Sequence, residues 1–396
     1  MKSYCKNIDI TDEKFIEAAI WDCLTHRDRK DFGREDIQRI IAEYGTIDVM
    51  ARKMSQELKE RKLNLPPVRH DIRRDKSNGK LREIDIEDIW QQYYDYVAAR
   101  ALEPALAMLG YYQCGCVEGK GQVWGMQMLH GWTQKYRFFT HSDIRKCYPS
   151  IPQQKLFRFL KKHIKNDLLL WLIETLVTHT TKTGISIGSR LSITLCQLYL
   201  SQIYHHITQD FCKYRRGKRI QIIPALLIFM DDIYMASNST SNLHKGEREL
   251  ARYAQEELGI YVKPDWTMVD TQESTLDCMG FRTQHDYTKM RRQNYEKTKR
   301  ALRSFKNNPN IGTAQNLTSR TGNVRFTDSY HFRKKYQWKQ TARQARRLIS
   351  NESKIHGETR TVGNLRGWQY DLLPDRTQPA GSRSGGPGDR GDVQRV

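Results

Sequence analysis

The 396-residue chain has no long hydrophobic run: no stretch approaches the roughly 20 apolar residues of a membrane-spanning helix, and none at the N-terminus resembles a signal peptide. Cysteine is sparse. The eight cysteines are scattered, and only Cys114 and Cys116 lie close together. Because there is no pair of Cys-x-x-Cys motifs, the sequence indicates neither a zinc ribbon nor a disulfide framework. We therefore expect a soluble, cytoplasmic protein with reduced thiols.

Acidic residues are few relative to basic ones, with 45 Asp and Glu against 66 Lys and Arg and a net charge of +21. A hydrophobic content of 38% is enough for a core and excludes wholesale disorder. The excess charge is concentrated in residues 282–360, which hold 20 Lys and Arg against five Asp and Glu, with aromatic residues between them. This combination favours nucleic acid as a partner, although basic patches also bind acidic proteins or membranes.

Periodicity and turn signals predict a mixed α and β chain. Helices are predicted over 11–62 (with Asp12 as an N-cap), 86–108, 153–180, 189–207 and 243–258. Strands are predicted as a hairpin over 68–86 turning at Ser77-Asn78-Gly79, as a strand over 136–144, as a pair within 220–236, and as short strands in 260–285. Residues 213–219, KYRRGKR, are predicted to form a basic loop, and residues 374–396 a disordered tail.

Two adjacent carboxylates, Asp231 and Asp232, interrupt the apolar, strand-like segment QIIPALLIFMDDIYMAS. Like charges in a buried hairpin cost free energy unless a cation compensates them. Oxygen-rich sites of this kind suit Mg²⁺ or Mn²⁺. A coincidental turn is the alternative, and the apolar residues on both sides make it the weaker one.

Asp143 is a third candidate, at the end of the predicted strand in YRFFTHSDIRKCYPSIP. A two-metal phosphoryl-transfer site needs acidic residues from neighbouring strands, which hold two cations about 4 Å apart. Taken by itself, Asp143 would rather be a helix N-cap or a turn residue.

Five segments occur in a fixed order along the chain: NGKLREI at 78–84, DIRKCYPSI at 143–151, GISIGSRLS at 184–192, FMDD at 229–232 and CMGF at 278–281. In order and spacing they resemble the fingers hairpin, motifs A, B and C, and the primer grip of the reverse transcriptases, especially those of bacterial retroelements. The resemblance covers roughly residues 65–285. It implies a cytoplasmic enzyme, bacterial or phage-encoded, that is an RNA-directed DNA polymerase.

The resemblance also implies roles for single residues. Asp143, Asp231 and Asp232 would be the catalytic carboxylates, and with the backbone carbonyl of Ile144 they would hold two Mg²⁺ ions, for which Mn²⁺ can substitute. Tyr148 would be a steric gate that packs on the sugar and excludes a 2′-hydroxyl, which implies deoxynucleotide substrates. A tyrosine of the hydrophobic core is the other interpretation of Tyr148.

Further roles follow from the same resemblance. Lys80 and Arg82 would grip the incoming triphosphate, because an arginine fork binds phosphate oxygens bidentately and a lysine acts as a point charge. Gly188 would let the backbone approach the nascent base pair. Gly280 and Phe281 would position the primer terminus.

Ile187 stands where most reverse transcriptases have glutamine, a feature typical of the diversity-generating retroelement enzymes. That subgroup implies low-fidelity copying and a small basic accessory protein. Other positions depart from the family pattern: Ser189, Arg190, Ser192, Ile193 and Trp266-Thr267. An antiphage-defence, retron or group II intron-like enzyme therefore remains open. So do a non-catalytic nucleic-acid-binding protein and an RNA polymerase, although Tyr148 argues against the last.

The fold implied is an α+β right-hand polymerase with an antiparallel palm sheet that carries the catalytic carboxylates. The expected domains are N-terminal helices and fingers (1–135), a palm (136–285) with a fingers insertion at about 153–183, a basic thumb (286–373) that holds the duplex, and the tail (374–396). The expected partners are template RNA, primer, cDNA and dNTPs, with no membrane.

Overall fold

The structure is a computed structural model that describes the chain except for residues 1–2, 26–33, 75–78, 80, 116 and 361–396; for Arg82 and residues 352–360 it describes only the backbone. The chain forms two compact units, one of residues 1–300 and 319–338 and one of residues 301–318 and 339–396. In the described part of the chain, no helix is both long and apolar enough to span a membrane. The predicted tail lies outside the described residues.

The N-terminal helices of the first unit pack around a buried helix, α4 (Ile89–Ala101). These are α1 (Glu13–Thr25), α2 (Glu35–Tyr44) and α3 (Ile47–Lys59), which confirm the helices predicted over 11–62. The predicted N-cap is also confirmed, since the Asp12 carboxylate accepts the Lys14 N–H at 3.3 Å. After α4 a short 3₁₀ helix, η1 (Glu103–Met108), takes over because Pro104 cannot continue the α-helix.

The predicted N-terminal hairpin consists of β1 (Arg69–Arg74) and β2 (Leu81–Ile86), which pair antiparallel. All of β1 is exposed to solvent. Of the predicted turn, only Gly79 lies within the described residues, with φ of +73°. A positive φ of this size is the reason for glycine there.

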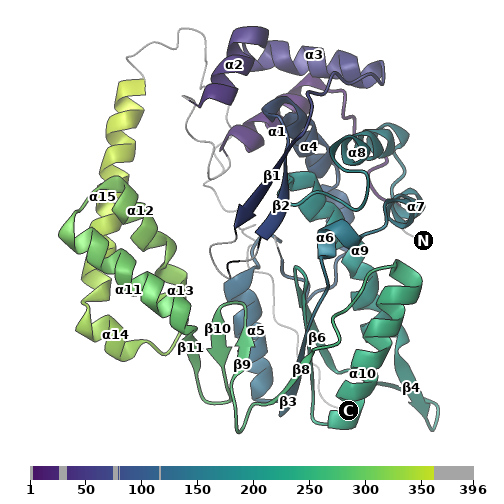
Figure 1. Cartoon of the computed structure of the whole chain (residues 1–396), viewed down its shortest axis with the longest axis vertical. Coiled ribbons are helices and arrows are strands. Elements are labelled where there is room, and N and C mark those ends of the chain that lie inside the picture. The colour runs from purple at the N-terminus through teal and green to yellow at the C-terminus, as the bar shows by residue number, and fades with distance from the viewer. Residues whose placement is uncertain (1–2, 26–33, 75–78, 80, 116, 361–396) are drawn as a thin grey trace, which may run out of the picture. The chain divides into compact units, whose positions relative to one another are not determined.

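A four-stranded antiparallel sheet, which we call the central sheet, forms the middle of the first unit (Figure 1). Its strand order is β6 (Ala225–Phe229), β7 (Asp232–Ser237), β3 (Phe138–Asp143) and β8 (Thr267–Asp270). The strand predicted at 136–144 and the pair predicted within 220–236 are confirmed. β3 lies between β7 and β8, so that distant segments of the chain meet there.

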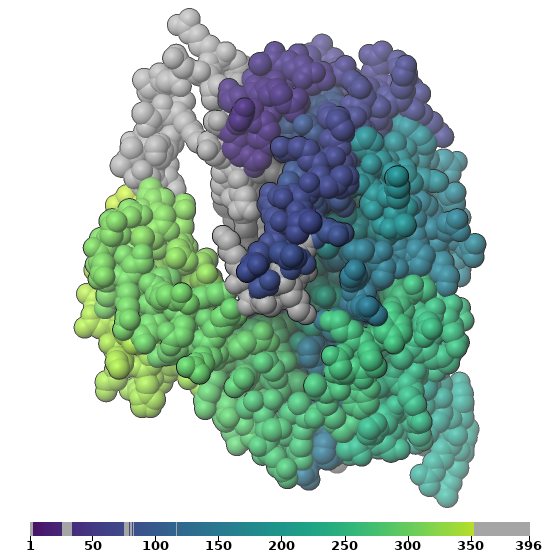
Figure 2. Space-filling model, viewed as in Figure 1, coloured from purple at the N-terminus to yellow at the C-terminus, as the bar shows by residue number. Residues whose placement is uncertain are grey.

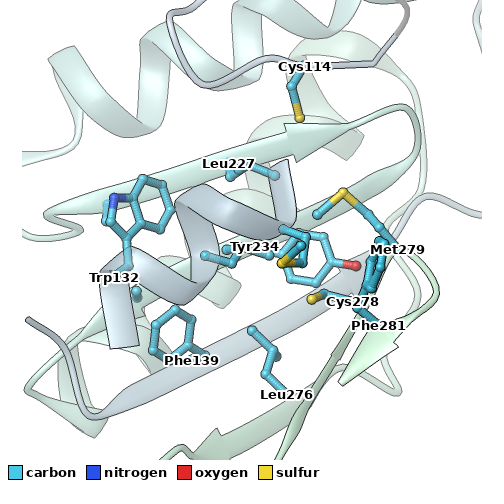
Figure 3. Packing of buried hydrophobic residues seen from close by; sticks show 13 residues of the cluster. Cys114, Trp132, Phe139, Leu227, Tyr234, Leu276, Cys278, Met279 and Phe281 are labelled. Carbon is cyan, nitrogen blue, oxygen red and sulfur yellow. The ribbon is translucent and has the colours of Figure 1, made fainter. Parts of the chain in front are cut away.

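One face of the central sheet packs on a helix with no counterpart among the predicted elements, α5 (Gln122–Thr133), and on a small sheet. The small sheet has the order β11 (Thr288–Met290), β10 (Phe281–Thr283) and β9 (Leu276–Cys278). Figure 3 shows the shared core, in which Trp132, Phe139, Tyr234 and Phe281 are all buried. This packing fixes the small sheet against the central one.

The remaining helices of this part are α6 (Cys147–Ser150), α7 (Gln153–His163), α8 (Asp167–Thr180), α9 (Arg190–His205) and α10 (Thr240–Tyr253). Single π-helical turns, η2 (His206–Asp210) and η3 (Ala254–Leu258), extend α9 and α10. The prediction of a loop over 213–219 is wrong. These residues form a hairpin of β4 (Cys212–Arg215) and β5 (Lys218–Gln221), because Arg216 and Gly217 adopt positive φ angles and close a two-residue turn.

The C-terminal helices divide between the two units. The first unit contains the start of α11 (Arg292–Asn307), together with α13 (Thr321–Arg325) and α14 (Tyr330–Lys335). The second unit contains the rest of α11, most of α12 (Ile311–Ser319) and most of α15 (Trp338–Arg360). The buried apolar residues of the second unit include Leu302, Phe305, Ala314, Leu317 and Ala345.

Candidate active site

Three carboxylates from two segments of the chain meet at one end of the central sheet. Asp143 ends β3 and lies directly opposite Asp232, which begins β7. Asp231 precedes it in the turn from β6, and its carbonyl accepts the Ile144 N–H at 3.2 Å. Directly opposite residues of an antiparallel pair have Cβ atoms about 5 Å apart. The structure therefore brings together the three acidic residues that the sequence predicted as a site.

The turn that carries Asp231 is held from two sides. It consists of Met230 and Asp231, since the residues before and after them pair with each other. Met230 has a φ of +57°, a conformation that costs a residue with a side chain about 1–2 kcal/mol. Gln197 of α9 donates to its sulfur at 3.6 Å. On the other side a Cβ at Gly115 would lie only 2.7 Å from the Met230 nitrogen, so only glycine fits there.

The electrostatics of this edge reflect burial and like charges. Burial raises the pKa of Asp231, and the neighbouring carboxylates of Asp232 and Asp143 raise it further. The ammonium group of Lys263 acts in the opposite direction. A divalent cation at this edge would relieve the same repulsion.

Two further side chains contact these carboxylates. The Lys263 N–H donates to the Asp143 carbonyl at 2.9 Å, and its ammonium nitrogen lies 2.5 Å from Asp143 Oδ1. His141 Nε2 lies 2.8 Å from Asp232 Oδ1, and its ring stacks on Tyr234 with centroids 4.6 Å apart. The sequence prediction missed both. Alternation along β3 could have identified His141, which lies two residues before Asp143 and on the same face.

The donor set fits a hard cation. Within the residues that the structure describes, no three Asp, Glu, His or Cys side chains converge closely enough to enclose a metal ion. Lys263 contacts Asp143 there, and His141 contacts Asp232. The carboxylates nevertheless supply only oxygen ligands, which Mg²⁺ prefers, and their mutual repulsion favours a cation. Lys263 supplies part of that positive charge.

Tyr148 and the loop 184–188 lie against each other next to this edge. Tyr148 is half-buried in α6, and its carbonyl accepts the Ile185 N–H at 3.0 Å. Gly184 has a φ of +68°, and a Cβ there would lie 2.3 Å from the Pro149 carbonyl oxygen. Ile187 follows half-buried, and Gly188 is exposed with a φ of +108°. The structure thus joins the candidate gate to the loop that carries Ile187.

Two buried acidic residues, Glu87 and Asp95, hold this loop through hydrogen bonds, and the sequence prediction missed both. The Glu87 carboxylate accepts a hydrogen bond from Ser186 Oγ at 3.3 Å, and burial raises the pKa of Glu87. The Asp95 carboxylate accepts one from Ser189, whose hydroxyl in turn accepts the Ser192 N–H and caps α9. Ser189 is one of the departures from the family pattern, and here it anchors the loop to α4.

The other predicted site residues are more distant in the fold or only partly described. Lys80 lies outside the described residues, and Arg82 is described only by its backbone in β2. Gly280 forms the β9–β10 turn with Met279, with a φ of +85°. Phe281 is fully buried, with its ring in the core of Figure 3. An effect of Phe281 on a primer would therefore act through the position of the turn.

Glu247 contacts β3, the strand that ends at Asp143, and its burial leads to a prediction about stability. It is buried on α10, where Ser142 of β3 donates to it at 2.5 Å, and burial raises its pKa above the ordinary 4.5. The fold therefore favours the protonated acid, so its contribution is present at low pH and is lost as the pH rises above 4.5 through the folded pKa. Glu247→Gln should stabilise the protein at pH 8 and flatten this dependence.

Urea unfolding at pH 5 and pH 8 measures the effect, with the exposed Glu118→Gln as the matched control. A Glu247→Gln protein that is less stable than wild type at pH 8, with an unchanged pH dependence, would show that the buried carboxylate is charged and compensated.

Parts of this chain are similar to known proteins. The family model described as reverse transcriptase (RNA-dependent DNA polymerase) matches residues 74–283, which include all three carboxylates. No curated protein matches the chain. Among solved structures the chain is similar to telomerase from Candida albicans in complex with a fragment of telomeric RNA, at 11% identity and a TM-score of 0.43. That similarity covers 77% of this chain and 66% of the telomerase chain.

Proposed function

Because this chain belongs to the reverse transcriptase family of RNA-dependent DNA polymerases, we propose that the carboxylate end of its central sheet catalyses DNA synthesis on an RNA template. The predicted α+β polymerase fold with an antiparallel sheet is confirmed. One observation supports the catalytic assignment most strongly. The strand register sets Asp143 opposite Asp232, with Asp231 in the adjoining turn.

In the proposed reaction Asp143 and Asp231 would be the main ligands of the cations, and Asp232 and the Ile144 carbonyl would be further ligands, with Asp232 more peripheral. Bound Mg²⁺ or Mn²⁺, two ions in all, would activate the primer 3′ oxygen and stabilise the leaving pyrophosphate. His141 orients the Asp232 carboxylate through their 2.8 Å contact. Lys263 neutralises Asp143 when no cation does, because its ammonium nitrogen lies 2.5 Å from Oδ1.

The nucleotide is proposed to bind between this edge and the loop 184–188. Tyr148 would pack on its sugar, and Ile187 and Gly188 would face the nascent pair. Lys80 and Arg82, on the β1–β2 hairpin, would hold the triphosphate. Gly280 and Phe281 would set the primer terminus through the β9–β10 turn.

The division into fingers (1–135), palm (136–285) and thumb (286–373) belongs to the same proposal. The basic segment 282–360 would provide phosphate contacts to the template–primer duplex, because its net charge is +15. Template RNA, primer, cDNA and dNTPs are therefore the proposed ligands.

The choice of substrates tests the proposal. The wild-type protein is given the same primer on an RNA template or a DNA template, with either dNTPs or NTPs, in Mg²⁺. We expect extension on RNA with dNTPs. Products formed only with NTPs would identify an RNA polymerase. Tight binding without any product, even with accessory factors and the native RNA present, would favour a non-catalytic binding protein.

Ile187 supports a finer proposal, that the enzyme copies with low fidelity in a diversity-generating retroelement, together with a small basic accessory protein. Glutamine can order an incoming nucleotide by hydrogen bonding, whereas Ile187 offers only apolar contact. An antiphage-defence, retron or group II intron-like role is the alternative, and accurate copying by the wild-type protein would favour it.

Ile187→Gln is therefore expected to lower misincorporation opposite template adenine severalfold. Sequencing of the cDNA measures the error spectrum, and Ile187→Leu, which keeps an apolar side chain, should leave it unchanged. If the glutamine and leucine variants make the same errors as wild type, Ile187 does not determine fidelity.

A further inference from the structure

The β4–β5 hairpin carries a concentrated charge that the proposed active site does not use. Seven consecutive residues, 213–219, include five cations: Lys213, Arg215, Arg216, Lys218 and Arg219. Every residue from 213 to 221 is exposed. The hairpin lies outside the central sheet, and in Figure 2 it projects from the first unit as a teal knob at the lower right.

The register of the hairpin places like charges opposite one another. Arg215 pairs directly with Lys218, and Lys213 lies two residues away on the same face. None of these three cations forms a salt bridge with another of the described residues. Like charges directly opposite destabilise a strand pair, and an isolated two-stranded hairpin is only marginally stable in water. A bound polyanion would remove this repulsion.

The opposite face of the hairpin presents an aromatic ring. Tyr214 is 72% exposed and lies opposite Arg219 in the register. An exposed ring beside a guanidinium group offers a stacking surface for a nucleic acid base.

The hairpin is also separate from the carboxylate edge. Its second strand leads into β6 at Ala225, and β6 runs from there to the turn at Asp231. At about 3.3 Å per residue, the start of β6 lies roughly 15–20 Å from that turn. A nucleic acid held at both places must therefore extend beyond the primer terminus.

We propose that the β4–β5 hairpin binds the phosphodiester backbone of a nucleic acid segment outside the primer–template duplex, with Tyr214 as a stacking platform for an unpaired base. RNA and DNA share this backbone, and both are tested. This binding goes beyond the proposed polymerase activity and does not require it.

The test uses the full-length protein and measures fluorescence anisotropy with a labelled stem–loop RNA or a DNA duplex of equal length, over a range of salt concentrations. Arg215→Gln/Lys218→Gln removes the opposed cations. Lys59→Gln/Lys62→Gln removes two exposed cations near the end of α3, at the other end of the first unit in Figure 1. Arg215→Lys/Lys218→Arg keeps the charge at the hairpin.

The hairpin double variant should bind at least about 10-fold more weakly at about 0.1 M salt, and its salt slope should fall by nearly two units. The α3 variant and the charge-keeping variant should bind as wild type. If the hairpin double variant loses affinity for the RNA probe alone, RNA is the ligand. If it loses affinity equally for both probes, the hairpin contacts only the backbone. Extension of a short primer on a short template should not change.

The proposal would be overturned if the hairpin double variant and the α3 double variant bound the nucleic acids with equal affinity. A hairpin variant that binds both nucleic acids as wild type would also overturn it and would leave an acidic protein as the partner. Neither result depends on polymerase activity, so failure here and failure of the proposed function are distinguishable.

Discussion

Asp231→Asn is expected to lower the rate of primer extension at least about 1,000-fold, because the amide removes a negative ligand from the site where two cations must be held. Asp143→Asn should have an effect of similar size, since Asp143 comes from the neighbouring strand and is the other proposed main ligand of the cations. Asp232→Asn should cost less, because Asp232 is the more peripheral carboxylate in the proposal. Single-turnover extension under saturating nucleotide measures all three.

The matched control is Asp265→Asn, an exposed carboxylate just beyond Lys263, which should retain full activity. Unfolding in urea separates lost chemistry from lost structure. Since burial raises the pKa of Asp231, the fold disfavours its charge, and Asp231→Asn should be at least as stable as wild type at neutral pH. An active Asp231→Asn protein would place the chemistry elsewhere.

Tyr148→Ala is expected to reduce the preference for dNTPs over NTPs by roughly 10- to 100-fold, because steric exclusion of one group is worth about 1–3 kcal/mol. The Tyr148 ring is half-buried, in a short helix four residues beyond the end of β3. Its carbonyl holds the 184–188 loop, so the backbone there should persist without the ring. Competitive incorporation of paired dNTP and NTP measures the preference.

Tyr148→Phe is the matched control, since it keeps the ring and should keep the preference. Two results would assign Tyr148 to the core instead. One is an alanine variant that still excludes NTPs as strongly as wild type. The other is a variant that loses activity with both nucleotides and unfolds at lower urea.

The strands and their carboxylates could be predicted because their signals are local. β6 and β7 are apolar runs with polar residues only where β7 begins and ends, and β3 follows an aromatic segment and ends at Asp143. The two-residue turn between β6 and β7 is short enough to predict from the sequence. The spacing of Asp143 and Asp231 could not itself show that they meet. That inference depended on the family resemblance, and the register confirms that the two strands are neighbours.

The partners of the carboxylates could not be predicted, because they depend on tertiary packing. Lys263 reaches Asp143 only because the chain after η3 returns beside β3 and pairs with it. Glu87 and Asp95 belong to the segment predicted only as a helix over 86–108, and nothing in their spacing shows that they support Ser186 and Ser189. Contacts of this kind decide how the site is held.

The wrong prediction at 213–219 has a physical cause. Alternation of apolar and polar residues is the usual strand signal, and KYRRGKR has none because both faces of the hairpin are exposed. The turn signal was also hidden, since Arg216 precedes Gly217 where asparagine or glycine is typical. Helix α5 was missed for a related reason: its tryptophans, methionines and glycines show no clear helical period.

Primer extension on an RNA template with dNTPs and Mg²⁺, by the wild-type protein beside the Asp231→Ala/Asp232→Ala double variant, tests most directly whether this edge of the central sheet is the polymerase site. We predict full-length cDNA from the wild type and none from the variant, with both proteins equally folded and equally able to bind the template–primer. Sequencing the cDNA then reports fidelity. Equal amounts of cDNA from both proteins would contradict the assignment of the carboxylates.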